Sequence, residues 1–581
     1  MNSTPLQTNP PTLMQRIGKW LPGVNALRHY QRAWLPRDLV AGLVLCALLV
    51  PQGMAYAELA GLPAITGLYT TVVCLAAYAL FGPSPYLVLG PDSSLGPMIA
   101  AVILPLAAGD VEYSIALAGM LALMVGIICV GAGLARLGFV SDLLSAPVRV
   151  GYLAGLAITI FVGQLPKLFG FSVDGGNLIA DSRDFLLNLD QTNIWSLGVG
   201  LLCLVIILGF KRWAPRAPGI LFAVIAAIAV TVLLDLAAKG VDTVGILPQG
   251  FPKPSFPAVQ VSDLAPLAAA AFGITLVAIG DTISTSAGFA ARRGYEVNSD
   301  QELVGIGSAN LLAGLFQGFP ISTSSSRTAV AEQSGAKTQL TGIVAAALVL
   351  AMLLFVPGLV RNLPQPALAA IVIVASISLF DLPALRHLWD VQKSEFALAV
   401  ICILGVGLVG VLEGIVIAVV VAIFQIFEAA WRPHSAVLGK PEGISGYHDL
   451  NRYPDAQLTP GLLMIRWDAP LIFANANLFR NFVRAQVART EPTPFWVLVA
   501  AEPITDVDTT AADMLLDLDE ELNAAGTHLI LAELKDPVRD KIERYGLYDT
   551  IDRRHFYPTI EDAIEEFHLE WGSKIKQGEN N

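Results

Sequence analysis

Charged residues are scarce in this chain of 581 residues. They make up 14% of the sequence, compared with about 25% in soluble proteins, whereas 54% of the residues are hydrophobic. The hydrophobic residues form long runs between residues 38 and 431, and most of these runs are long enough to span a bilayer. After residue 440 the runs shorten and charges return. The composition therefore predicts a short N-terminal segment (1–37), a membrane domain (38–431) and a small soluble domain (440–575).

Histidine and cysteine are too few and too scattered for several kinds of chemistry. None of the seven histidines falls inside an apolar run, which excludes a histidine proton relay in the membrane and leaves carboxylates as the ion-carrying groups there. The five cysteines are isolated within apolar runs, so their spacing argues against a disulfide framework or a zinc site. We expect no cofactor.

Basic residues are scarce in the soluble tail. Residues 446–581 hold 24 acidic and 13 basic residues, so −11 of the chain's net charge of −12 belongs to them. Without a basic stripe, nucleic acid is not an expected partner. The tail has no glycine-rich phosphate motif, and its alternating strand and helix patterns predict a small α/β domain that is regulatory and not an enzyme.

The membrane domain contains fourteen predicted segments. They are 38–58, 64–81, 92–106, 113–135, 150–166, 194–210, 218–238, 264–291, 302–317, 322–334, 338–358, 366–381, 394–411 and 412–430. Seven spans in each half would make the halves inverted repeats. Lys and Arg precede the first span and recur in every second loop, which places the N-terminus and the soluble tail in the cytoplasm.

Two short segments at matching places in the two halves are interrupted by glycine, proline and hydroxyl residues. They are residues 86–98 and 316–330. A bilayer tolerates irregular backbone only where it is buried in protein or lines a cavity. Paired interrupted helices are typical of the substrate site of a secondary transporter, so the pattern predicts a transport protein.

The residue types in these segments indicate an anionic substrate. The hydroxyls are Ser93 and Ser94 in the first segment, and Ser325, Ser326 and Thr328 in the second. The start of a half-helix offers free N–H groups and a positive dipole end, and Arg327 would complete an oxyanion pocket. The alternative is that Arg327 only neutralises Asp92 or Glu332, and Asp92 could also cap its own half-helix.

Asp281 is the strongest candidate for ion coupling. It lies in the middle of a span, and Thr285 follows one turn later, so both oxygens project from one helical face. The pair suits a sodium ion, or the carboxylate alone could hold a proton; the alternative is a hydrogen bond between helices. Glu58, at the end of the first span, is either a second coupling carboxylate or an interface residue.

Several other residues have two explanations. Tyr56, Gln52 and Phe319 could line the pocket or only pack in the core. In the tail, Thr509 or Thr510 begins a predicted helix, where either could accept a phosphate, although helix N-capping explains both.

The motifs closely resemble those of the SulP (solute carrier family 26) anion transporters with a C-terminal STAS domain. The matching segments are Pro51 to Tyr69, Gly82 to Pro85, Gly90 to Ser94, Asn298 to Leu303, Ser326 to Val330, Gly335 to Leu340 and, in the STAS-like tail, Ile504 to Met514. The resemblance implies two inverted seven-span repeats, divided into a core and a gate, in an elevator-like homodimer. It implies a substrate site between the third and tenth spans, at Ser93, Ser94, Ser325, Ser326, Arg327 and Thr328, and an acidic coupling residue at Asp281.

The motifs disagree about the substrate. Asp281 with Thr285 resembles the sodium-dependent bicarbonate branch, whereas Ser326 and Arg327 resemble the sulfate and chloride branches. We predict a proton- or sodium-coupled transporter of a small inorganic anion in the inner (plasma) membrane, in contact with lipid, with a site for a cytoplasmic regulator on the STAS domain. Sulfate is the first choice of substrate. Bicarbonate, C4-dicarboxylates and uncoupled anion conduction are the alternatives.

Overall fold

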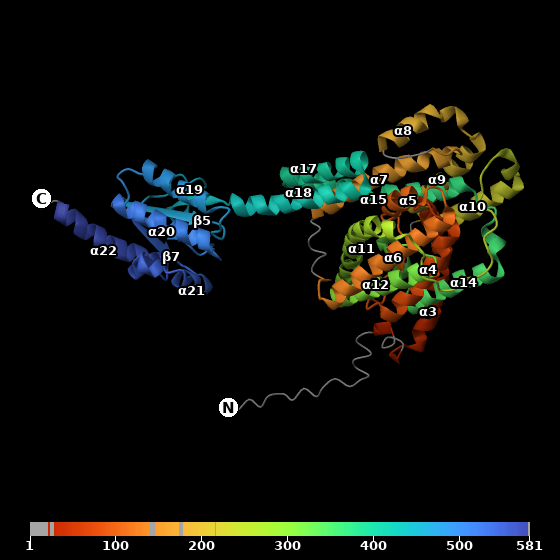
Figure 1. Cartoon of the computed structure of the whole chain (residues 1–581), viewed down its shortest axis with the longest axis horizontal. Coiled ribbons are helices and arrows are strands. Elements are labelled where there is room, and N and C mark those ends of the chain that lie inside the picture. The colour runs from red at the N-terminus through yellow and green to blue at the C-terminus, as the bar shows by residue number, and fades with distance from the viewer. Residues whose placement is uncertain (1–20, 24–27, 139–145, 174–177, 215–216, 579–581) are drawn as a thin grey trace, which may run out of the picture. The chain divides into compact units, whose positions relative to one another are not determined.

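The computed structural model describes residues 21–23, 28–138, 146–173, 178–214 and 217–578, so most of the predicted N-terminal segment 1–37 lies outside the described residues. The chain divides into two compact units, one up to Ala422 and the other from Ile423 onward (Figure 1). The first unit is helical, and the second contains a sheet. The predicted order of a helical membrane region followed by an α/β domain is therefore confirmed.

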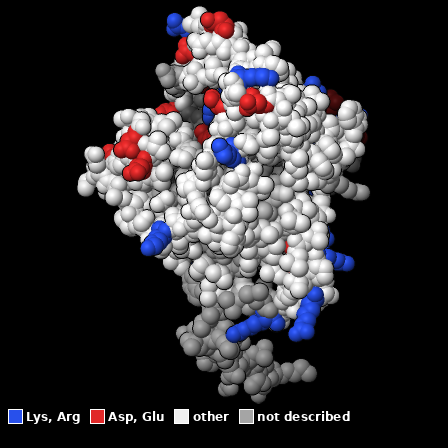
Figure 2. All heavy atoms as spheres, turned by 90° about the vertical axis from the view of Figure 1, so that its right-hand side faces the viewer, with Lys and Arg blue, Asp and Glu red and all other residues white. Residues whose placement is uncertain are grey.

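A helix lies at each of the fourteen predicted spans. They are α3 (Leu35–Leu59), α4 (Ala64–Phe81), α5 (Gly96–Ala107), α6 (Val111–Leu134), α7 (Ala146–Phe169), α9 (Ile194–Trp213), α10 (Gly219–Leu233), α11 (Leu264–Arg293), α12 (Ser299–Leu315), α13 (Ser325–Gln333), α14 (Leu340–Phe355), α15 (Gln365–Leu379), α17 (Lys393–Leu404) and α18 (Val411–Trp431). Among the described helices, seven are long and apolar enough to cross a membrane. Most of the face seen in Figure 2 carries neither acidic nor basic side chains, as a surface in lipid requires.

The helices of the first unit form two bundles. In the first bundle, α3 to α6 pack on α11 to α14; in the second, α7, α9 and α10 pack on α15 and α17. The two bundles meet mainly where α3 contacts α15. Two short helices, α8 (Leu178–Leu187) and α16 (Leu382–Val391), pack on α7. Each half of the chain thus contributes helices to both bundles.

Glycines bring α6 and α12 of the first bundle into backbone contact. A Cβ atom on Gly126 would lie 2.8 Å from the carbonyl oxygen of Gly307, and a Cβ atom on Gly314 would lie 2.5 Å from that of Gly119. Small residues allow membrane helices to approach this closely, because van der Waals contact drives their association in lipid.

The second unit is a six-stranded sheet with helices on both faces. Its strand order is β4 (His448–Asp449), β3 (Ser435–Gly439), β5 (Leu462–Trp467), β6 (Trp496–Ala500), β7 (His528–Ala532) and β8 (Phe556–Tyr557). Strands β5 to β8 are parallel, and β3 and β4 form an antiparallel hairpin at one edge. One face is covered by α19 (Ala476–Arg489), α20 (Thr509–Ala524) and α21 (Asp536–Arg544), and the other by α22 (Ile560–Gly578).

The glycine contact gives a direct test of the packing of the first bundle. We expect Gly126→Ala to lower the stability of the protein by about 1–3 kcal/mol, because the new methyl group overlaps the backbone of α12. Thermal unfolding of the purified protein in detergent measures the change.

Gly131→Ala in the same helix is the matched control, because a Cβ atom there meets no other atom within 4 Å. An equal melting temperature for the two variants would contradict the close approach of α6 and α12.

Candidate functional site

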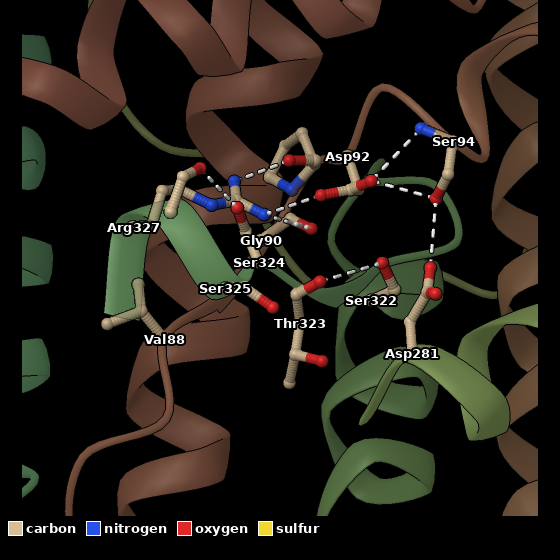
Figure 3. A network of polar contacts seen from close by, with 12 residues as sticks. Val88, Gly90, Asp92, Ser94, Asp281, Ser322, Thr323, Ser324, Ser325 and Arg327 are labelled. Carbon is tan, nitrogen blue, oxygen red and sulfur yellow. Dashed lines mark hydrogen bonds and ion pairs between the residues drawn. The ribbon is translucent and has the colours of Figure 1, made fainter. Parts of the chain in front are cut away.

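The two interrupted segments meet in the first bundle. Strand β1 (Leu89–Gly90) pairs antiparallel with β2 (Ser322–Thr323), with Leu89 opposite Thr323 and Gly90 opposite Ser322. Half-helix α5 begins soon after β1, and half-helix α13 begins soon after β2. The short ladder satisfies backbone groups that lipid could not, and it brings the N-terminal ends of both half-helices to one place (Figure 3).

Arg327, in the first turn of α13, binds the first interrupted segment. Its Nη1 donates to the carbonyl oxygen of Pro91 at 2.5 Å, and its Nη2 donates to the carbonyl oxygen of Gly90 at 3.5 Å and to Asp92 Oδ2 at 3.2 Å. Only 1% of Arg327 is exposed. A Cβ atom on Gly90 would lie 2.9 Å from Nη1, so a larger residue at this position would displace the guanidinium. The guanidinium therefore holds the two segments together.

Asp92 both pairs with Arg327 and caps the turn before α5. Its Oδ1 accepts the backbone N–H of Ser94 at 3.0 Å and the hydroxyl of Ser94 at 2.8 Å. Glu332, the other partner considered for Arg327, instead pairs with Arg293 at 2.6 Å. The buried charge of Asp92 is thus compensated within the site.

Helix α11 contacts both interrupted segments through the predicted coupling residues. The Ser94 hydroxyl oxygen, whose shorter hydrogen bond is to Asp92, also lies 3.2 Å from Asp281 Oδ2, and the hydroxyls of Thr285 and Ser325 lie 2.8 Å apart. Asp281 is half-buried and Thr285 is buried. As predicted from their spacing, both side chains point from one face of α11 toward the broken segments (Figure 3 shows Asp281).

A cavity of about 570 Å³ opens beside these residues. The predicted site residues that line it are Tyr56, Ser93, Ser94, Asp281, Thr285, Ser325 and Ser326. Gln52 also lines it, and its Oε1 atom is buried without a hydrogen-bond partner in the described part of the chain. Residues of the second bundle, among them Lys211 and Ser378, line the opposite wall. The cavity therefore lies between the two bundles.

Three other predicted substrate residues lie behind the cavity wall. Arg327 binds backbone as described, and Thr328 Oγ1 accepts the backbone N–H of Val88 at 3.1 Å. Phe319 is 1% exposed and belongs to the hydrophobic core of the first unit. These three residues shape the site without lining the cavity.

Glu58 lies at a second cavity, of about 1290 Å³, which Lys167 and Gln365 also line. Gln365 Nε2 donates to Glu58 Oε1 at 2.9 Å, and this hydrogen bond joins α3 to α15. Glu58 is thus placed at a contact between the bundles, apart from Asp281.

The structure also shows two polar residues that the sequence reasoning missed. Tyr152, on α7, donates its hydroxyl to the carbonyl oxygen of Ser94 at 3.0 Å. Glu302 is fully buried and accepts hydrogen bonds from Tyr78, Ser84 and Ser286. Tyr152 gives no signal in the sequence, because a tyrosine in an apolar run also packs well without a polar partner. Glu302 is the first residue of the predicted span 302–317, and no role was predicted for it from the sequence.

In the soluble domain, Asp508 caps α20. Its Oδ1 accepts the N–H of Ala511 at 2.8 Å, while Thr509 and Thr510 are exposed at the first two helical positions. A hydrogen bond from Lys541 lowers the pKa of nearby Asp506, so this carboxylate is ionised at neutral pH. N-capping thus falls to Asp508, and both threonine hydroxyls are accessible.

Comparisons with known proteins cover nearly the whole chain. The profile of the Sulfate permease family matches residues 35–403, and that of the STAS domain matches residues 453–563. A probable sulfate transporter of Mycobacterium tuberculosis is 41% identical over 548 residues, which is 94% of this chain and 98% of that protein. A probable sulfate transporter 4.2 of Arabidopsis thaliana is 33% identical over 91% of this chain and 80% of its own length.

Solved structures share the fold. Murine Solute Carrier 26 family member A9, an anion transporter in the inward-facing state, superposes with a TM-score of 0.87 at 24% identity, over 96% of this chain and 95% of its own. The transmembrane domain of a cyanobacterial bicarbonate transporter superposes with a TM-score of 0.59 at 23% identity, over 68% of this chain and 98% of its own. The expectation of a transporter and not an enzyme is confirmed, and the chain belongs to the sulfate permease family (SulP, solute carrier family 26) with a C-terminal STAS domain.

Proposed function

We propose that this protein is a secondary active transporter that carries sulfate across the plasma membrane together with a coupling cation. The observation that supports this most strongly is the convergence of four serine hydroxyls and Asp281 on one cavity between two bundles. The sulfate transporters among the relatives, at 41% and 33% identity, favour sulfate over other anions.

The proposed anion site lies where the two half-helices begin. Ser93 and Ser94 precede α5, Ser325 and Ser326 open α13, and all four line the cavity. Hydroxyl donors and the N-terminal ends of two helices favour an anion, and Lys211 adds a positive charge on the opposite wall. Because Arg327 compensates Asp92, that carboxylate does not repel the substrate.

Asp281 is the proposed coupling residue. An ionised Asp281 at the edge of the cavity would repel an anion, and binding a cation removes that repulsion. A proton needs only the carboxylate, whereas a metal cation needs several oxygen ligands, and Asp281 and Thr285 supply oxygens from two side chains. We therefore favour a proton, with sodium as the second choice.

Sodium-driven bicarbonate transport is the second candidate function. It is favoured by the spacing of Asp281 and Thr285 and by the fold shared with a bicarbonate transporter. Sulfate and bicarbonate transport would use the same movement, in which the first bundle carries the binding site past the second bundle. In both cases the N-terminus and the STAS domain lie in the cytoplasm.

We further propose a homodimer, with a regulator that binds the STAS domain.

Uptake into proteoliposomes distinguishes the candidates. We expect labelled sulfate to accumulate under an imposed proton gradient, because protonation of Asp281 admits the anion. Labelled bicarbonate and an imposed sodium gradient are tested in parallel.

Sodium-driven accumulation of bicarbonate without sulfate uptake would contradict the sulfate assignment. Sulfate flux that only follows its own concentration gradient would indicate an uncoupled channel.

Asp281→Asn tests the coupling role. The amide keeps the size of the side chain but binds no proton, so we expect gradient-driven accumulation to fall to the level of liposomes without protein, while downhill exchange of sulfate continues. Asp235→Asn is the matched control, because Asp235 is exposed and does not line the cavity. Undiminished accumulation by Asp281→Asn would rule out coupling at this carboxylate.

A charge-compensation experiment tests the structural role of Arg327. We expect Arg327→Gln to destabilise the protein by about 3–5 kcal/mol, because Asp92 then keeps an unpaired buried charge. The double variant Arg327→Gln/Asp92→Asn should recover most of the stability and of the sulfate uptake. A stable double variant without uptake would show instead that the guanidinium itself binds the substrate.

A further inference from the structure

We propose that Tyr152 is a latch between the bundles that makes their movement depend on the state of Asp281. This inference rests on the proposed function, because it explains how a cation at Asp281 controls the transport step. It concerns a residue of the second bundle that lines neither of the two cavities described above.

A continuous hydrogen-bonded path leads from Asp281 to Tyr152. The hydroxyl oxygen of Ser94 lies 3.2 Å from Asp281 Oδ2 and 2.8 Å from Asp92 Oδ1, so the two carboxylates share its single proton. The carbonyl oxygen of Ser94 accepts the hydroxyl of Tyr152 at 3.0 Å. Asp281 and Ser94 belong to the first bundle, whereas Tyr152 belongs to α7 in the second. Ser94 is therefore held by the coupling carboxylate on one side and by the opposite bundle on the other.

The hydrogen bond between Tyr152 and Ser94 is buried, so water does not replace it when it breaks. Tyr152 is 4% exposed and Ser94 is 1% exposed. The Tyr152 hydroxyl also lies 3.3 Å from Met98 Sδ, which is a weak acceptor and no equal substitute for the carbonyl oxygen. Sliding the bundles past each other separates Tyr152 from Ser94 and leaves buried polar groups without partners. The hydrogen bond therefore stabilises the arrangement seen here.

The state of Asp281 controls this bond through Ser94. An ionised Asp281 only accepts hydrogen bonds, so it competes with Asp92 Oδ1, which is 2.8 Å from Ser94 Oγ, for the single proton of the Ser94 hydroxyl and draws that side chain toward α11. When Asp281 binds a proton, its own O–H becomes a donor, and the Ser94 hydroxyl donates to Asp92 alone. Ser94 is then held only within its own segment and is no longer drawn toward α11, which releases its carbonyl from Tyr152. The latch thus opens when the coupling ion has bound.

A second polar contact lies close to the path. Arg149, one turn before Tyr152 on α7, donates from Nη1 to the hydroxyl of Ser284 at 2.9 Å, and Ser284 follows Asp281 on α11 by three residues. Both contacts join α7 to the first bundle near the coupling residue, one at α11 and the other at the segment before α5. Arg149 is partly exposed, so water can replace its bond, and the buried Tyr152 contact remains the controlling one.

Tyr152→Phe tests the latch, because it removes only the hydroxyl. Without the latch the bundles move whether or not Asp281 carries its ion. We expect gradient-driven sulfate accumulation to fall by about fivefold or more, in proportion to the loss of one buried hydrogen bond, while downhill exchange stays equal or rises. Tyr113→Phe is the matched control, because the Tyr113 hydroxyl binds Asp263 within the first bundle.

Two results would overturn the latch alone. They are accumulation by Tyr152→Phe equal to that of the wild type, and loss of accumulation and exchange together in a folded Tyr152→Phe protein. Should Tyr152→Phe fail to fold, Tyr152→Leu also removes the hydroxyl and must show the same separation of accumulation from exchange. Wild-type protein that accumulates sulfate under neither gradient would contradict the proposed function itself and the latch with it.

Discussion

The need of every backbone group in a bilayer for a hydrogen-bond partner governs this structure. Two helices end before they cross the membrane, and the chain must satisfy the exposed N–H and C=O groups at each break. The antiparallel pairing of β1 with β2 does this from within the protein. Because the backbone groups of the two breaks form hydrogen bonds with each other, the breaks must lie side by side. The starts of α5 and α13 converge as a consequence. The proposed anion site follows from this convergence.

Arg327 completes the pairing electrostatically. It binds two carbonyl oxygens of the first break and the carboxylate of Asp92, so one buried cation supports the irregular backbone and cancels the charge beside it. The charge of the cavity wall near the half-helices then depends mainly on Asp281. In the proposed mechanism, a single carboxylate, Asp281, senses the coupling ion, and Ser94 links the protonation of that carboxylate to the second bundle.

Much of the fold could be predicted from the sequence, because hydrophobic runs and broken segments are local signals. Most spans agree with the helices to within a few residues, and the alternating strand and helix patterns of the tail predicted its α/β class. The two-residue strands β4 and β8 could not be predicted, because strands this short carry no periodicity. The fourteen-span count and the inverted relation of the halves stay predictions.

The site was predictable in its residue types but not in its contacts. The hydroxyls and Asp281 could be named from their place in broken or interrupted runs. The direction of Arg327 toward the backbone of Gly90 and Pro91, and the bond between Tyr152 and Ser94, depend on segments far apart in the chain. Such contacts form only when both bundles are assembled, so no local sequence pattern predicts them.

A cryo-electron microscopy structure of the protein in the presence of sulfate tests the central claim most directly. The account predicts a tetrahedral density between the starts of α5 and α13, within hydrogen-bond distance of the serine hydroxyls of both segments, with Arg327 still bound to Asp92. Density for the anion at another place, or an Arg327 that has left Asp92 to bind it, would contradict the account.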